Sequence, residues 1–108
     1  MPFTADYREE EPTREEVDRS GGLLLLEFGA NWCGHCQALS PTLEALLDEW
    51  SDVRHLRIAD GRGKPLGRSF RVKLWPTLVL LRDGKVIAQL VRPTGQQVRE
   101  AFDELSAS

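Results

Sequence analysis

The sequence predicts an α/β domain in which a central mixed β-sheet is flanked by helices. The first sign is the apolar run LLLLEF, residues 23–28, which lies beside glycines and is typical of a strand buried on both faces. The second is helical periodicity over residues 33–50, followed by a strand-like segment at 53–60, which together predict a β-α-β unit. The third is a pair of β-rich runs around Asp83 and Gly84, a dipeptide favoured in type I′ hairpins. A parallel unit joined to an antiparallel hairpin gives a mixed sheet.

The remaining elements follow in chain order. Residues 1–12 form a lead-in segment with room for a short edge strand, and the TREE motif at 13–16 matches a capping box that starts a short helix over 14–19. The helix at 33–50 has large apolar residues at spacings of three and four, and Pro41 should kink it. Residues 61–77 form a glycine-rich loop with one helical stretch near 65–70, and a last amphipathic helix starts at Thr94 or Gly95.

Length and composition indicate one soluble domain spanning residues 1–108. The chain is 41% apolar and 29% charged, and its net charge of −3 comes from both signs scattered along it. The charges form no basic face of the kind that binds nucleic acid. The longest apolar run is too short to cross a membrane. The first residues are polar and acidic, unlike a secretory signal. We therefore expect a cytoplasmic monomer that binds neither nucleic acid nor membrane.

The only two cysteines lie in the motif WCGHC, residues 32–36. A structural disulfide between them would close a very short loop and would stabilise little. A structural zinc ion needs four ligands, and the chain offers only Cys33, His35, Cys36 and His55. Because His35 lies between the cysteines, all three would struggle to reach one ion. We therefore expect no metal at this site, although a zinc-binding module remains an alternative.

Redox chemistry fits the position of this pair better. The motif follows a predicted buried strand and opens a predicted helix, where unpaired N–H groups and the helix dipole favour negative charge. A thiolate at Cys33 would be stabilised there, and the thiolate is the species that attacks a disulfide. Cys36 lies one turn along on the same face, so it can resolve the mixed disulfide that forms.

Several motifs resemble one known family. From about residue 23 to 105 the chain resembles thioredoxin, and its CGHC centre looks like that of protein disulfide isomerase domains. EFGANWCGHC is similar to the family's strand-to-active-site segment, and Pro41 matches the proline that kinks the active-site helix. FRVKLWPTLVLLRDGK is similar to the segment that carries the family's cis-proline, here Pro76. The resemblance implies a thioredoxin fold and a thiol–disulfide oxidoreductase that acts on protein thiols and disulfides, needs no bound cofactor, and takes electrons from a thioredoxin-reductase-like or other donor.

The resemblance also assigns roles around the cysteines. Cys33 is the exposed nucleophile, Cys36 is the resolving thiol, and Trp32 and Gly34 border the site where substrate binds. His35 stands where thioredoxins proper have proline. A protonated imidazole there can stabilise the Cys33 thiolate, which shifts the disulfide toward a more oxidising, isomerase-like potential. The alternative for His35 is an ordinary solvated loop residue.

Behind the cysteines the resemblance points to Glu27 and Arg57. Glu27 falls where the family has a buried aspartate that is thought to accept the proton of the resolving cysteine. Burial raises the pKa of a carboxyl, which would allow such a shuttle near neutral pH. Arg57 matches a lysine position that often accompanies the acid, so it could pair with Glu27. The alternatives are a glutamate that reaches solvent and an exposed arginine at a strand end.

On the substrate side, Pro76 should present a backbone edge. Trp75 would pair its N–H and C=O with an extended substrate chain, as in strand addition. The chain departs from the family at two points: Trp75 replaces a small aliphatic residue, and Arg92, Pro93 and Thr94 replace a glycine region. These changes predict narrow partner choice and poor recycling by thioredoxin reductase. Other possibilities are an oxidase or isomerase, and a binding or chaperone module whose redox activity is incidental.

Overall fold

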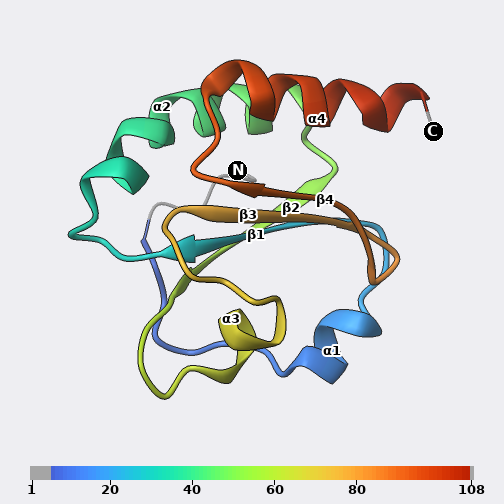
Figure 1. Cartoon of the computed structure of the whole chain (residues 1–108). Helices are drawn as coiled ribbons and strands as arrows, with labels where there is room; N and C mark the ends of the chain where they lie inside the picture. The colour runs from blue at the N-terminus through green and yellow to red at the C-terminus, as the bar shows by residue number, and fades with distance from the viewer. Residues whose placement is uncertain (1–5, 108) are drawn as a thin grey trace.

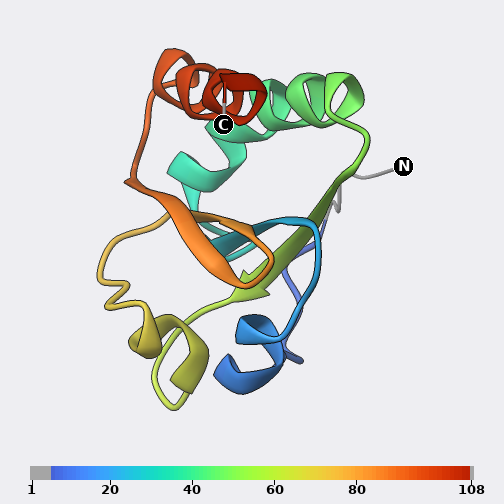
Figure 2. The same ribbon diagram turned by 90° about the vertical axis from the view of Figure 1, so that its right-hand side faces the viewer.

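The computed structural model describes residues 6–107, which form a mixed sheet covered by helices on both faces. The strands are ordered β2-β1-β3-β4, with α2 and α4 on one face and α1 and α3 on the other (Figures 1 and 2). The strands are β1 (Leu23–Gly29), β2 (Val53–Ala59), β3 (Thr77–Arg82) and β4 (Lys85–Val91). The helices are α1 (Arg14–Asp18), α2 (Gly34–Glu49), α3 (Pro65–Ser69) and α4 (Gly95–Ala107).

Strand pairing confirms the predicted mixed sheet. β1 pairs in parallel with β2 and antiparallel with β3, so it is central, which explains its nearly unbroken apolar run. β3 and β4 form the predicted hairpin. Its two turn residues, Asp83 and Gly84, have φ values of 50° and 80°, and a type I′ turn requires positive φ at both.

The two faces of β1 bury different groups. Leu25 packs with the apolar residues of α2 and α4, whereas Leu24, Leu26 and Phe28 pack with those of α1 and α3. Because side chains alternate along a strand, Glu27 lies on the same face as Leu25, beneath α2. A carboxylate is thereby placed in the core close to the start of the active-site helix.

The helix boundaries follow the predicted signals to within one or two residues. Thr13 and Glu16 form the capping box at the start of α1. Cys33 caps α2, which continues past Pro41 to Glu49. A further observation is that no helix in residues 6–107 is both long and apolar enough to cross a membrane.

The lead-in segment pairs with the sheet, as the sequence analysis allowed. Arg8 forms a parallel bridge with Ile58 at the outer edge of β2. The Arg8 N–H donates to the Arg57 carbonyl at 2.9 Å, and the Ala59 N–H donates to the Arg8 carbonyl at 2.8 Å. Residues 1–5 of the lead-in lie outside the described residues. This pairing places Tyr7 beside the end of β1.

Candidate active site

The two cysteines lie where β1 gives way to α2. Cys33 has the extended backbone of a helix N-cap, and its Sγ accepts a hydrogen bond from the Cys36 N–H at 3.3 Å. A sulfur in this place receives a helix N–H donor and the positive end of the helix dipole. The sequence thus placed the pair correctly at a helix N-terminus.

The two sulfurs differ in access to solvent. Cys33 is 7% exposed and Cys36 is 0% exposed. The predicted exposure of Cys33 is therefore wrong in degree, because Ala30, Ala59 and Trp75 pack around it. Of the two cysteines, Cys33 is still the one that a substrate sulfur can reach.

The buried Cys36 is hard to ionise. Burial first, and then the hydrogen bond with Cys33, raise the pKa of the Cys36 thiol to about 11. At neutral pH Cys36 is therefore protonated. A role as attacking group requires that this proton be lost, and so requires some stabilisation of the resulting thiolate.

Glu27 is fully buried and is held by three side chains. The Arg57 guanidinium binds it in a bidentate way, with Nε 2.9 Å from Oε1 and Nη2 3.1 Å from Oε2. His55 Nε2 lies 2.9 Å from Oε1, and the Tyr7 hydroxyl donates to Oε2. The ion pair anticipated between Glu27 and Arg57 is thus present, and neither residue reaches out to solvent.

This cluster reverses the expected ionisation of Glu27. Burial by itself raises the pKa of the carboxyl, but the hydrogen bonds from His55 and Arg57 and the guanidinium charge outweigh it, so the pKa of Glu27 is lowered. The expectation of a raised pKa is wrong because it considered burial without these partners. Glu27 is a stable carboxylate at neutral pH, and such a group is a weak proton acceptor.

Two members of this cluster were missed as site residues. His55 was weighed only as a metal ligand, although its spacing of two from Arg57 on one strand puts both on the same face. Tyr7 belongs to the lead-in segment, and it lies under the Arg57 guanidinium, whose Cζ is 4.7 Å from the ring centroid. No local pattern around Tyr7 indicates this position, since it depends on the pairing of Arg8 with β2.

Two tryptophans border the substrate side of the site. Trp32 is 77% exposed and packs edge-on against Trp75, with ring centroids 5.5 Å apart. Trp75 is anchored through its Nε1–H, which donates to Asp60 Oδ2 at 2.9 Å. The peptide bond between Trp75 and Pro76 is cis, as the family resemblance implied.

Arg92 lies closer to this surface than expected. Its Nε–H donates to the Trp75 carbonyl at 2.8 Å, so an acceptor that we assigned to a substrate backbone already accepts one hydrogen bond from a side chain. Arg92 also has a φ of 45°, a left-handed conformation that favours glycine. The residue that replaces the family's glycine region therefore keeps a glycine-like backbone while it adds a long charged side chain.

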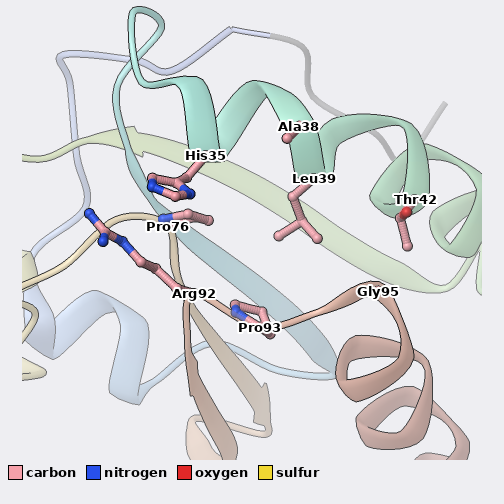
Figure 3. A pocket seen from close by; sticks show the side chains of 8 residues that line it. All are labelled: His35, Ala38, Leu39, Thr42, Pro76, Arg92, Pro93 and Gly95. Carbon is pink, nitrogen blue, oxygen red and sulfur yellow. The ribbon is translucent and has the colours of Figure 1, made fainter.

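A surface pocket of about 230 Å³ adjoins the cis-proline (Figure 3). Figure 3 shows His35, at the start of α2, beside Pro76, with Arg92 and Pro93 on the other side. Gly34, which lies between the two cysteines in the sequence, is exposed. The full lining comprises His35, Ala38, Leu39, Thr42, Pro76, Arg92, Pro93 and Gly95.

The structure thus brings the predicted site residues together in two places. Glu27 and Arg57 bind each other in the core, and the substrate-side residues contact one another around Cys33 and the cis-proline. Within residues 6–107, no three His, Cys, Asp or Glu side chains come together in a way that could hold a metal ion.

Comparison with known proteins agrees with this geometry. The thioredoxin family model matches residues 6–104. The chain belongs to the thioredoxin family. It is similar to thioredoxin 2 from Pseudomonas aeruginosa PAO1 in its reduced form, with 49% identity, a TM-score of 0.84, and coverage of 95% of this chain and 96% of that one.

Curated thioredoxins show the same likeness. A thioredoxin from Listeria monocytogenes is 33% identical over 91 residues, which cover 83% of this chain and 85% of the relative. Thioredoxin H2 from Arabidopsis thaliana is 28% identical over 92 residues, which cover 85% of this chain and 69% of the relative. The predicted thioredoxin fold and family are confirmed, and the chain is a thiol–disulfide oxidoreductase with its two cysteines at CXXC spacing.

Proposed function

We propose that this member of the thioredoxin family reduces disulfides in partner proteins, with Cys33 as nucleophile and Cys36 as resolving thiol. The observation that carries this assignment is the contrast between the sulfurs: Cys33 caps α2 and reaches solvent, whereas Cys36 is fully buried beside it. Cys33 attacks one substrate sulfur and releases the other as a thiol. Cys36 then attacks Cys33, which frees the substrate and leaves a disulfide in the protein.

The working cycle requires a source of electrons. Thioredoxins act on protein disulfides and are reduced by thioredoxin reductase, and we propose a donor of this kind for the disulfide between Cys33 and Cys36. We place the cycle in the cytoplasm and in a monomer. The chemistry needs no bound cofactor, since both electrons are stored in the two sulfurs.

We further propose that Trp75 and Arg92 narrow the choice of partner. A substrate chain beside Pro76 must pass the indole of Trp75 and must share the Trp75 carbonyl with Arg92, which binds it at 2.8 Å. Misfit of this kind excludes partners whose shape suits a flat, open groove. The positive charge of Arg92 favours a partner with an acidic residue near its cysteine.

The double variant Trp75→Ile with Arg92→Gly is expected to be recycled faster by a generic thioredoxin reductase. It removes the bulk and frees the carbonyl, and glycine suits the left-handed backbone at position 92. We expect the NADPH oxidation rate to rise on the order of tenfold, which corresponds to a misfit of about 1.4 kcal/mol. The measurement is steady-state NADPH oxidation at equal protein concentration.

Insulin reduction driven by dithiothreitol is the control for that experiment. Both proteins should support it, because a small reductant does not need the docking surface. If the wild type is already recycled as well as an ordinary thioredoxin, or if the double variant gains nothing, Trp75 and Arg92 do not restrict access.

A further inference from the structure

The Tyr7 side chain lies beside two groups that can each accept its proton. Its hydroxyl donates to Glu27 Oε2, and the side chain packs with Cys36 in one buried cluster. A Cβ atom built on Gly29 would fall 2.5 Å from Cys36 Sγ and 2.9 Å from Tyr7 Cε1. The Cys36 sulfur and the Tyr7 ring therefore both pack against Gly29 and lie close to each other. Because a hydroxyl has a single proton to donate, Tyr7 can serve only one of these acceptors at a time.

Tyr7 is held firmly in this place. Its backbone N–H donates to Asn31 Oδ1 at 3.1 Å, and the next residue, Arg8, bonds to both Arg57 and Ala59 of β2. The ring is buried under the Arg57 guanidinium. The hydroxyl oxygen is therefore fixed, and rotation of its proton is the simplest change open to it.

We propose that Tyr7 is a hydrogen-bond switch that assists the resolving cysteine: its proton faces Glu27 while Cys36 is a thiol and turns to Sγ when Cys36 becomes a thiolate. In the first state the Cys36 S–H donates to the Tyr7 oxygen. In the second state Glu27 keeps its bonds from Arg57 and His55, so the carboxylate is not left without donors. This inference deepens the proposed function and rests on it.

The charges around Cys36 support a donor role over a base role. Glu27 on β1 is held as a carboxylate by His55 and Arg57 on β2, which makes it a weak acceptor for the Cys36 proton. Burial, and then the charge of Glu27, raise the pKa of Tyr7 far above its ordinary value, so the phenol stays protonated throughout. Cys33, across the first turn of α2, is the other titratable group that faces Cys36. A neutral hydroxyl is thus available to a new thiolate.

The resolving step balances within the mixed disulfide. Cys36 loses its proton, and its Sγ forms a bond to Cys33 Sγ. The bond between Cys33 Sγ and the substrate sulfur breaks, and the substrate sulfur leaves with the electron pair and in net takes up the proton that Cys36 lost. The protein dithiol is oxidised and the substrate disulfide is reduced. Tyr7 gains and loses no proton in this step, because its proton only changes acceptor.

The test uses the full chain and dithiobis(nitrobenzoate), an aromatic disulfide whose released thiolate is coloured. With reduced protein in slight excess, attack by Cys33 gives a first phase and attack by the buried Cys36 gives a second. In Tyr7→Phe the second-phase rate relative to the first should fall on the order of tenfold, the effect of losing one hydrogen bond to a charged sulfur. The fall should be largest near neutral pH. It should shrink as the pH approaches the pKa of the Cys36 thiol, because Cys36 is then ionised without help.

Two further variants sharpen the result. In Ser20→Ala, a hydroxyl that donates to the Val17 carbonyl at 2.7 Å is lost just after α1, which lies on the other face of the sheet from α2, and the ratio should stay as in the wild type. In Glu27→Gln the competing acceptor is weaker, so the second phase should be at least as fast as in the wild type. A fall in Glu27→Gln equal to that in Tyr7→Phe would overturn the switch and would assign Glu27 as the base.

A substitution that keeps the aromatic ring tests the hydroxyl without disturbing the packing of Tyr7. Tyr7 is the only tyrosine in the chain, so growth on 3-fluorotyrosine changes this residue alone. The more acidic hydroxyl is a better donor, and the second phase should become severalfold faster. An unchanged second phase in both Tyr7→Phe and the fluorinated protein would overturn the switch. Absence of a fast first phase in the wild type would instead contradict the proposed function.

Discussion

Replacing Cys36 with serine is expected to stop turnover and to leave partner proteins attached to Cys33. The first attack is unaffected in kind, but the resolving attack has no thiol, so the mixed disulfide persists. Steady-state insulin reduction should fall by on the order of a hundredfold or more, as expected when one member of a covalent relay is lost. Non-reducing electrophoresis of cell extracts should show bands that vanish on reduction.

The matched control is the double variant Cys33→Ser with Cys36→Ser. It has no nucleophile and should trap nothing, although its fold is unchanged. Trapped partners seen equally with this control, or none seen with Cys36→Ser under mild oxidation, would contradict the assigned roles. If instead the double variant kept full cellular function, the chain would act as a binding or chaperone module.

Replacing Glu27 with alanine is expected to cost a large part of the stability. Arg57 would remain buried without the carboxylate that now binds both Nε and Nη2. Breaking a buried pair from one side typically costs about 3–5 kcal/mol, and the whole domain is stabilised by about 5–15 kcal/mol. Urea unfolding near pH 7 measures this change in free energy.

Glu44→Ala is the control, because Glu44 lies exposed on α2. Its loss should change the free energy of unfolding by about 0.5 kcal/mol or less. If Glu27→Ala costs no more than Glu44→Ala, the cluster does not hold a carboxylate in the way described.

The cost of Glu27→Ala should also depend on pH. A glutamate in the unfolded chain has a pKa of about 4.3, and the pKa of Glu27 in the folded protein is lower. The contribution of Glu27 is therefore complete above the unfolded pKa and is lost as the pH falls through the folded one. The difference between wild type and variant should accordingly shrink in acid, and a difference that grows there would contradict the lowered pKa.

Most of the fold could be predicted because its signals are local. The buried run of β1, the capping box at Thr13, and the turn at Asp83 and Gly84 each depend on neighbouring residues in the sequence. The order of the elements then leaves few ways to form the sheet. The two cysteines were also predictable, since their spacing and their place between a strand and a helix are both visible in the sequence.

The surroundings of Glu27 could not be predicted in the same way. The direction of its pKa shift depends on which donors reach it, and these come from β2 and from the lead-in segment. His55 was within reach of an argument from strand alternation, because it shares a face with Arg57. Tyr7 was not, since its position follows from a single bridge between Arg8 and Ile58.

The substrate side shows a similar limit. The sequence indicated that Trp75 and Arg92 are unusual, but not that they bind each other. Arg92, whose side chain donates to the Trp75 carbonyl, has a left-handed backbone, a conformation uncommon for arginine.

The measurement that tests the central claim most directly is the order in which the reduced cysteines are alkylated. Iodoacetamide is added near pH 6, samples are quenched over time, and fragment-ion mass spectrometry separates the adducts of Cys33 and Cys36. We expect Cys33 to be modified well before Cys36, because Cys36 is fully buried and its pKa is raised to about 11. Equal labelling of the two residues, or labelling of Cys36 first, would contradict the assignment of Cys33 as the nucleophile.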